Sequence, residues 1–160
     1  MTELTAREVI DRFVEAAVKR DFEGMGALVA PDFVEDYPQS GEIVRGRENF
    51  VALLQTYPGG LAQGAMDRDD VRTVGVDERW VMTPTFTVVR VEGSGETYTV
   101  SFRVRYPDDS TWYLIGIRTI KGGLIQTATT YFAPLFDPPP WRSHLVELKR
   151  DHEGESDANR

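Results

Sequence analysis

Hydrophobic residues near the start of the chain recur with the period of an α-helix. Between residues 5 and 20 they fall on one helical face, at Ala6, Val9, Ile10, Phe13 and Ala17. Thr5 and Glu8 have the spacing of a capping box, in which the two residues bond to each other's backbone N–H groups. The pattern therefore predicts an amphipathic helix over residues 5–20.

Two shorter helices are predicted further along the chain, over residues 21–29 and 47–57. Pro31 ends the first, because the residue before a proline avoids helical geometry, and Pro58 ends the second. Between them, Phe33–Pro38 is typical of a short strand, which its proline restricts to the edge or the end of a sheet.

From Val71 onward, apolar and polar residues alternate, which indicates β-strands. Turn residues at 93–95, 107–110 and 122–123 divide this stretch into hairpins, and the last strand runs from residue 124 to about residue 132. Helices followed by hairpins predict an α+β domain, with three N-terminal helices packed on an antiparallel sheet.

The turns also predict a register for the sheet: Phe86 opposite Phe102, Phe102 opposite Ile115, and Ile115 opposite Thr130. One face is then almost entirely apolar and should meet the helices and line any pocket. It carries Met82, Phe86, Val88, Tyr98, Val100, Phe102, Val104, Tyr106, Tyr113, Ile115, Ile117, Ala128, Thr130 and Phe132. Arg90 is the only charged residue that this register places on the inward face.

The opposite face of the predicted sheet combines arginines with large apolar side chains. Its members include Arg103, Arg105, Arg118, Trp112, Leu114 and Tyr131. Because this face is in part too apolar for free exposure, we expect a second subunit to cover it and form a homodimer.

Composition limits the classes of partner. The chain has 26 acidic and 18 basic residues and a net charge of −8, which disfavours binding to nucleic acids and to anionic membranes. Neither a signal-peptide pattern nor a membrane-length apolar run is apparent, so a cytoplasmic protein is expected. We expect one domain over residues 1–148 and a disordered polar tail over 149–160.

Few residues suit metal or nucleophilic chemistry. The chain has no cysteine, and both histidines, His144 and His152, lie in the C-terminal segment beyond the predicted sheet. This arrangement leaves no cluster of metal ligands and no histidine to activate a serine. Since no glycine-rich phosphate loop follows a strand, neither a metal nor a cofactor is expected.

Local motifs resemble the SnoaL-like branch of the NTF2-like proteins over about residues 5–148. They are Tyr37–Glu42 followed by Arg45–Asn49, and Tyr131–Pro134 followed by Phe136 and Pro140–Arg142. The resemblance implies the NTF2-like cone, in which the helices pack on a strongly curved sheet. Related branches include polyketide cyclases, ketosteroid isomerases, epoxide hydrolases, dehydratases, and members that only bind or dimerise, so the fold does not determine the reaction.

The resemblance also suggests site residues. Asp36 and Tyr37 fall where active relatives place a pocket dyad, which implies Asp36 as a base, with Tyr37 and Tyr106 polarising an oxygen. Relatives carry acidic residues two positions apart on the inward face of the last strand, where this chain has Ala128 and Thr130. That departure argues against catalysis at these two positions.

The residues expected to line a ligand pocket are Trp80, Met82, Phe86, Arg90, Tyr98, Phe102, Tyr113, Ala128, Thr130 and Phe132. Arg90 would either bind a ligand carboxylate or extend outward to solvent, and residues 59–70 would either cover the pocket mouth or merely connect helix to sheet. Three functions stay open: a binding protein for a hydrophobic ligand, an enzyme acting on a hydrophobic carbonyl or polyketide-like substrate, and a dimerisation module.

Overall fold

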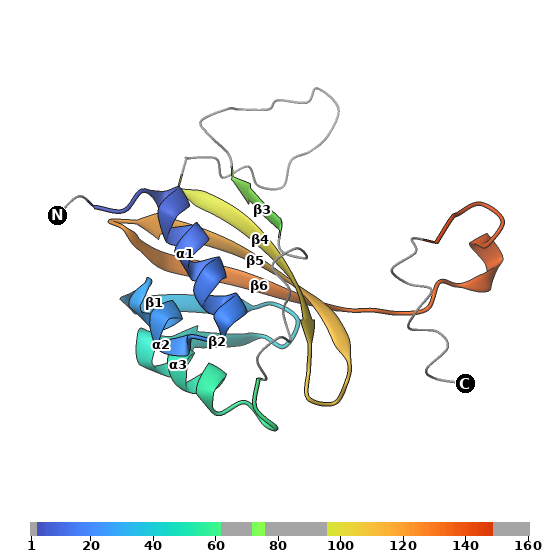
Figure 1. The fold of residues 1–160 in the computed structure, drawn as a ribbon, viewed down its shortest axis with the longest axis horizontal. Helices are drawn as coiled ribbons and strands as arrows, with labels where there is room; N and C mark the ends of the chain where they lie inside the picture. Colours follow the sequence, from blue (N-terminus) through green and yellow to red (C-terminus); the bar gives the residue numbers. More distant parts are fainter. Residues whose placement is uncertain (1–2, 62–71, 76–95, 149–160) are drawn as a thin grey trace.

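The computed structural model describes residues 3–61, 72–75 and 96–148 (Figure 1). Several predicted features lie outside the described residues, namely Trp80, Met82, Phe86, Arg90, the turn at 93–95 and the tail at 149–160.

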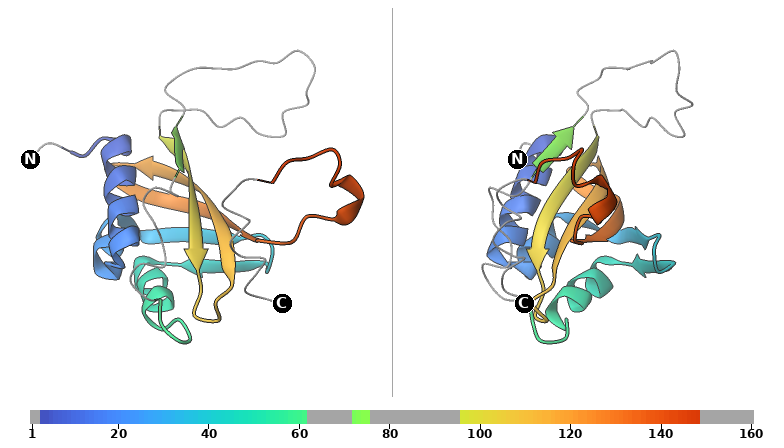
Figure 2. Two further views of the ribbon diagram at one scale, coloured as in Figure 1. Left: turned by 45° about the vertical axis from the view of Figure 1, so that its right-hand side comes forward. Right: turned by 90° about the vertical axis from the view of Figure 1, so that its right-hand side faces the viewer.

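The described chain forms three helices and one curved sheet of six strands (Figures 1 and 2). The helices are α1 (Ala6–Lys19), α2 (Phe22–Ala27) and α3 (Arg47–Gln55). The strands are β1 (Val29–Tyr37), β2 (Glu42–Arg45), β3 (Arg72–Gly75), β4 (Thr97–Arg105), β5 (Thr111–Lys121) and β6 (Leu124–Pro134). The three predicted helices and the α+β architecture are confirmed.

The sheet has the strand order β2-β1-β6-β5-β4-β3. Strand β1 runs parallel to β6, and the other neighbouring strands pair in antiparallel fashion. The predicted strand at Phe33–Pro38 is confirmed as part of β1, and Pro38 directly follows its last residue. However, β1 already begins at Val29, and it is not an edge strand because β2 pairs with it. Within the described residues, no helix has the length and apolar character needed to cross a bilayer.

The loop between β4 and β5 holds three residues, 107–109, instead of the four predicted at 107–110. Asp109 has a left-handed conformation with φ 65°, and its N–H donates to the carbonyl oxygen of Tyr106. These features are typical of a three-residue hairpin loop. Phe102 consequently pairs with Leu114 instead of Ile115.

The next hairpin contains a second offset of one residue. Gly122–Gly123 forms the predicted two-residue turn, with positive φ at both positions. However, an irregularity between Thr119 and Ile120 shifts the pairing of the strands beyond the turn. Thr130 consequently pairs with Gly116 instead of Ile115.

These two offsets exchange the faces of β5 but leave those of β4 and β6 as predicted, because successive side chains of a strand point to opposite faces. The inward prediction is therefore wrong for Tyr113, Ile115 and Ile117, each of which is at least 36% exposed. The residues of β5 that face the helices are Trp112, Leu114, Gly116 and Arg118.

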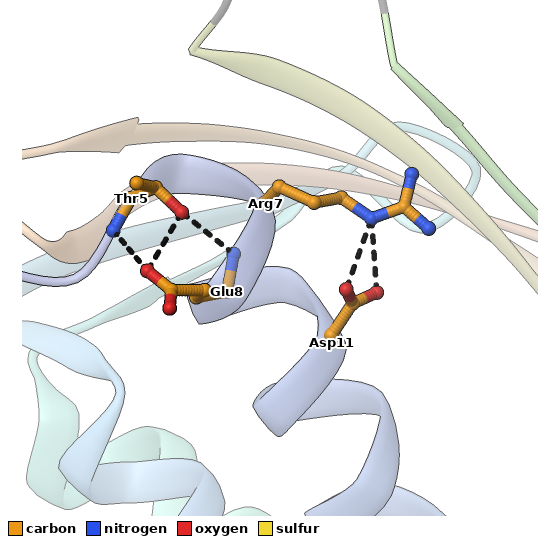
Figure 3. A network of polar contacts seen from close by, with 4 residues as sticks. All are labelled: Thr5, Arg7, Glu8 and Asp11. Atoms are coloured by element: carbon orange, nitrogen blue, oxygen red, sulfur yellow. Dashed lines mark hydrogen bonds and ion pairs between the residues drawn. The ribbon is translucent and has the colours of Figure 1, made fainter.

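Helix α1 supplies much of the core and begins with the predicted capping box (Figure 3). The Thr5 N–H donates to the Glu8 carboxylate at 2.8 Å, and the Glu8 N–H donates to the Thr5 hydroxyl at 3.3 Å. Arg7 and Asp11 form an exposed ion pair one turn further on, with 3.0 Å between Nε and Oδ1. The cap satisfies backbone N–H groups that have no partner within the helix.

We predict that Thr5→Ala lowers the free energy of unfolding by about 1 kcal/mol, because an N-terminal N–H loses its acceptor. Asp11→Ala is the matched control, since it removes only an exposed ion pair of the same helix and should have a smaller effect. Urea denaturation followed by circular dichroism measures both. Equal losses in the two variants would contradict a capping role for Thr5.

Candidate functional site

A pocket of about 690 Å³ lies between the helices and the inward face of the sheet. Its walls are mainly apolar and are provided by Phe13, Phe22, Met25, Phe50, Leu53, Leu54, Phe102, Val104, Trp112, Leu114 and Phe132. Helices α1, α2 and α3 thus form one side, while β4, β5 and β6 form the other. A small group of polar side chains interrupts this apolar lining.

Glu35 is the acidic residue of that polar group. It lies on β1, is only 4% exposed and lines the pocket. The Thr130 hydroxyl donates to Oε1 of Glu35 at 2.6 Å, and the Tyr37 hydroxyl donates to Oε2 at 3.1 Å. Both carboxylate oxygens therefore accept a hydrogen bond, so the buried acidic group is not without polar partners.

Asp36, the predicted base, does not line the pocket. It follows Glu35 directly on β1 and pairs with Thr129 of β6, so strand alternation directs it to the opposite face of the sheet. Glu35 therefore takes the inward position that the sequence predicts for Asp36.

The hydroxyl of Tyr37 stays protonated next to this carboxylate. Burial is the main cause that raises the pKa of Tyr37 far above its usual value, and the neighbouring negative charge of Glu35 adds to the effect. The ring packs edge-on against Phe132, with 5.3 Å between the ring centroids. Tyr37 thus lines the pocket with its hydroxyl held by Glu35.

Arg118 places a positive charge in the same pocket, on β5. Its side chain is buried, and its guanidinium carbon lies 4.7 Å from the ring centre of Phe13 and 5.9 Å from that of Phe102. Burial lowers the pKa of Arg118, whereas the negative charge of Glu35 acts in the opposite direction. Glu35 therefore stabilises the charged guanidinium in an apolar setting.

Aromatic residues surround another part of the pocket. Tyr106 stacks on Tyr57 with 5.4 Å between centroids and meets Trp112 edge-on at 6.4 Å. Burial is the main cause that raises the pKa of Tyr106 to about 12. Leu61 also lines the pocket, while residues 62–70 of the loop predicted to cover its mouth lie outside the described residues.

The structure brings five of the predicted site residues to the pocket, namely Tyr37, Phe102, Tyr106, Thr130 and Phe132. Tyr98 and Ala128 are buried but do not line it, and Tyr113 lies on the outer face. Among the described residues, no group of three or more His, Cys, Asp or Glu side chains is arranged to hold a metal ion.

Sequence reasoning missed Glu35 and Arg118. One signal for Arg118 was present: Gly116 lies two positions earlier, and an isolated glycine within a strand often marks the close approach of another group. A Cβ atom at position 116 would lie 2.1 Å from Nη1 of Arg118, so the glycine makes room for the guanidinium.

Residues 10–126 match the model of the SnoaL-like domain family. No curated protein is significantly similar to the chain in sequence.

Solved structures that share the fold include an NTF-2 like protein of unknown function from Burkholderia xenovorans LB400. It is 26% identical, with a TM-score of 0.64 over 90% of this chain and 94% of that one. A proposed ketosteroid isomerase from Kribbella flavida DSM 17836 is 23% identical, with a TM-score of 0.61 over 90% of this chain and 89% of that one. A de novo designed protein with a curved β-sheet is 14% identical, with a TM-score of 0.51 over 91% and 93% of the two chains.

Proposed function

The chain belongs to the SnoaL-like domain family, and we propose that it uses its pocket to bind a small, largely apolar molecule. The observation that carries this proposal is the cavity of about 690 Å³ between helices and sheet, with apolar walls and one polar group. Pockets for small molecules typically measure about 300–1,000 Å³ and combine mainly hydrophobic walls with a few placed polar groups.

The cluster of polar side chains around Glu35 supports a specific orientation of the ligand. Glu35, Tyr37 and Thr130 are joined by hydrogen bonds, and Arg118 interacts electrostatically with Glu35. Most of the remaining wall is apolar, although Arg20, Glu42 and Asp108 also line it, so a ligand with one polar end would direct that end toward these four buried residues. This feature favours a binding pocket over a domain that serves dimerisation alone.

We predict that Leu114→Trp weakens binding of an uncharged fluorophore such as N-phenylnaphthylamine by at least about tenfold, because the larger side chain fills the pocket. Ile115→Trp is the matched control, since the next residue of β5 points to the outer face. Fluorescence titration measures both affinities. A wild-type protein that fails to bind apolar probes, or equal affinities in the two variants, would refute pocket binding.

A second candidate function is proton transfer with Glu35 as the base. Each carboxylate oxygen of Glu35 accepts one hydrogen bond and keeps a second lone pair, and the residue lines the pocket. To stabilise an oxygen on which negative charge develops, the protonated Tyr37 would redirect its one O–H from Glu35 to that oxygen. This version of the enzyme hypothesis replaces Asp36 by its neighbour Glu35.

If this second function is correct, the wild-type protein accelerates α-deuterium uptake by hydrophobic cyclic ketones in D₂O. Glu35→Gln should then lower the rate by at least about 100-fold, while the adjacent control Asp36→Asn stays within about twofold of wild type. NMR follows the exchange, and circular dichroism verifies folding. Absence of any acceleration by the wild type, or full activity of Glu35→Gln, would eliminate Glu35 as a base and leave the binding function intact.

A further inference from the structure

We propose that the pocket ligand presents an uncharged oxygen acceptor, such as the carbonyl of a ketone, ester or amide, and that Arg118 donates a hydrogen bond to it. This inference rests on the proposed binding function and specifies the chemistry of the ligand's polar end.

The guanidinium of Arg118 is held in a defined place. Gly116 lies under it on the same strand face, and any Cβ there would collide with Nη1 at 2.1 Å. The rings of Phe13 and Phe102 flank the guanidinium at 4.7 and 5.9 Å. Aromatic faces attract a cation, so these contacts hold the guanidinium beside the pocket.

Nη1 of Arg118 is buried and has no hydrogen-bond partner among the described residues. Buried N–H groups nearly always have a partner, because a donor removed from water without a replacement acceptor destabilises the fold. Because Nη1 itself has almost no exposed surface, the guanidinium must turn slightly toward the pocket that Arg118 lines before an acceptor atom of a bound molecule can supply the missing bond.

The charges around the pocket favour a neutral acceptor over an anion. The positive charge of Arg118 already faces the negative charge of Glu35. The charged residues that line the pocket are two arginines, Arg20 and Arg118, and three carboxylates, Glu35, Glu42 and Asp108. A ligand carboxylate would add to this negative excess within apolar walls, whereas a carbonyl oxygen accepts the same bond without adding charge.

The test compares three ligands with one skeleton: acetylnaphthalene, ethylnaphthalene and naphthoate. We expect the wild type to bind the ketone at least about tenfold more tightly than either of the other two, because only the ketone is a neutral acceptor. In Arg118→Met, the affinity for the ketone should fall to the level of the affinity for ethylnaphthalene. The affinity for ethylnaphthalene should differ little between the variant and the wild type. Titration calorimetry measures all six affinities.

Three outcomes separate this inference from the binding function. A ketone preference that survives in Arg118→Met, or tighter binding of naphthoate than of the ketone, would overturn the role of Arg118. Failure of the wild type to bind even ethylnaphthalene would instead refute the binding function. If Arg118→Met does not fold, the double variant Glu35→Gln/Arg118→Met removes both charges together and gives the same comparison.

Discussion

The arrangement of the pocket depends on the electrostatic interaction between Arg118 and Glu35. Each charge lies in a mainly apolar interior, and neither would be stable there without compensation. Glu35 also accepts hydrogen bonds from Thr130 and Tyr37, so β1, β5 and β6 all contribute to one polar group. Replacing a buried ion pair by apolar residues of similar volume is often neutral or stabilising, so these two charges are weak evidence for stability and are better explained by the proposed ligand recognition.

The backbone places Arg118 in the pocket through two local irregularities on either side of it. The three-residue loop with the left-handed Asp109 shifts the pairing of β5 with β4, and the irregularity at Thr119–Ile120 shifts its pairing with β6. Together they shift β5 by one residue from the predicted pairing with both neighbours. Without them the charge of Arg118 would lie on the outer face and Ile117 would point inward, and the pocket would lose this cation.

The same two irregularities set the limit of what the sequence predicts. The helical period around Phe13 and the strand alternation around Phe102 give helices, strands and fold class correctly, because long periodic segments carry a strong signal. A single-residue offset leaves no mark on periodicity, yet it reverses every side chain of the strand that follows. For the same reason Glu35 and Asp36 could not be told apart before the pairing of β1 with β6 was known.

The fold does not distinguish binding from catalysis, because a designed curved-sheet protein and a proposed isomerase both share this architecture. The residues of the pocket must decide between the two functions. Within the pocket, the choice depends on Glu35. If Arg118 holds the oxygen of a ligand, proton transfer requires in addition that a carbon-bound hydrogen of the same ligand reach a free lone pair of Glu35. A carbonyl compound with no hydrogen on the adjacent carbons can satisfy Arg118 and still offer Glu35 no proton. Binding and reaction therefore place separate demands on the ligand, although they use the same polar group.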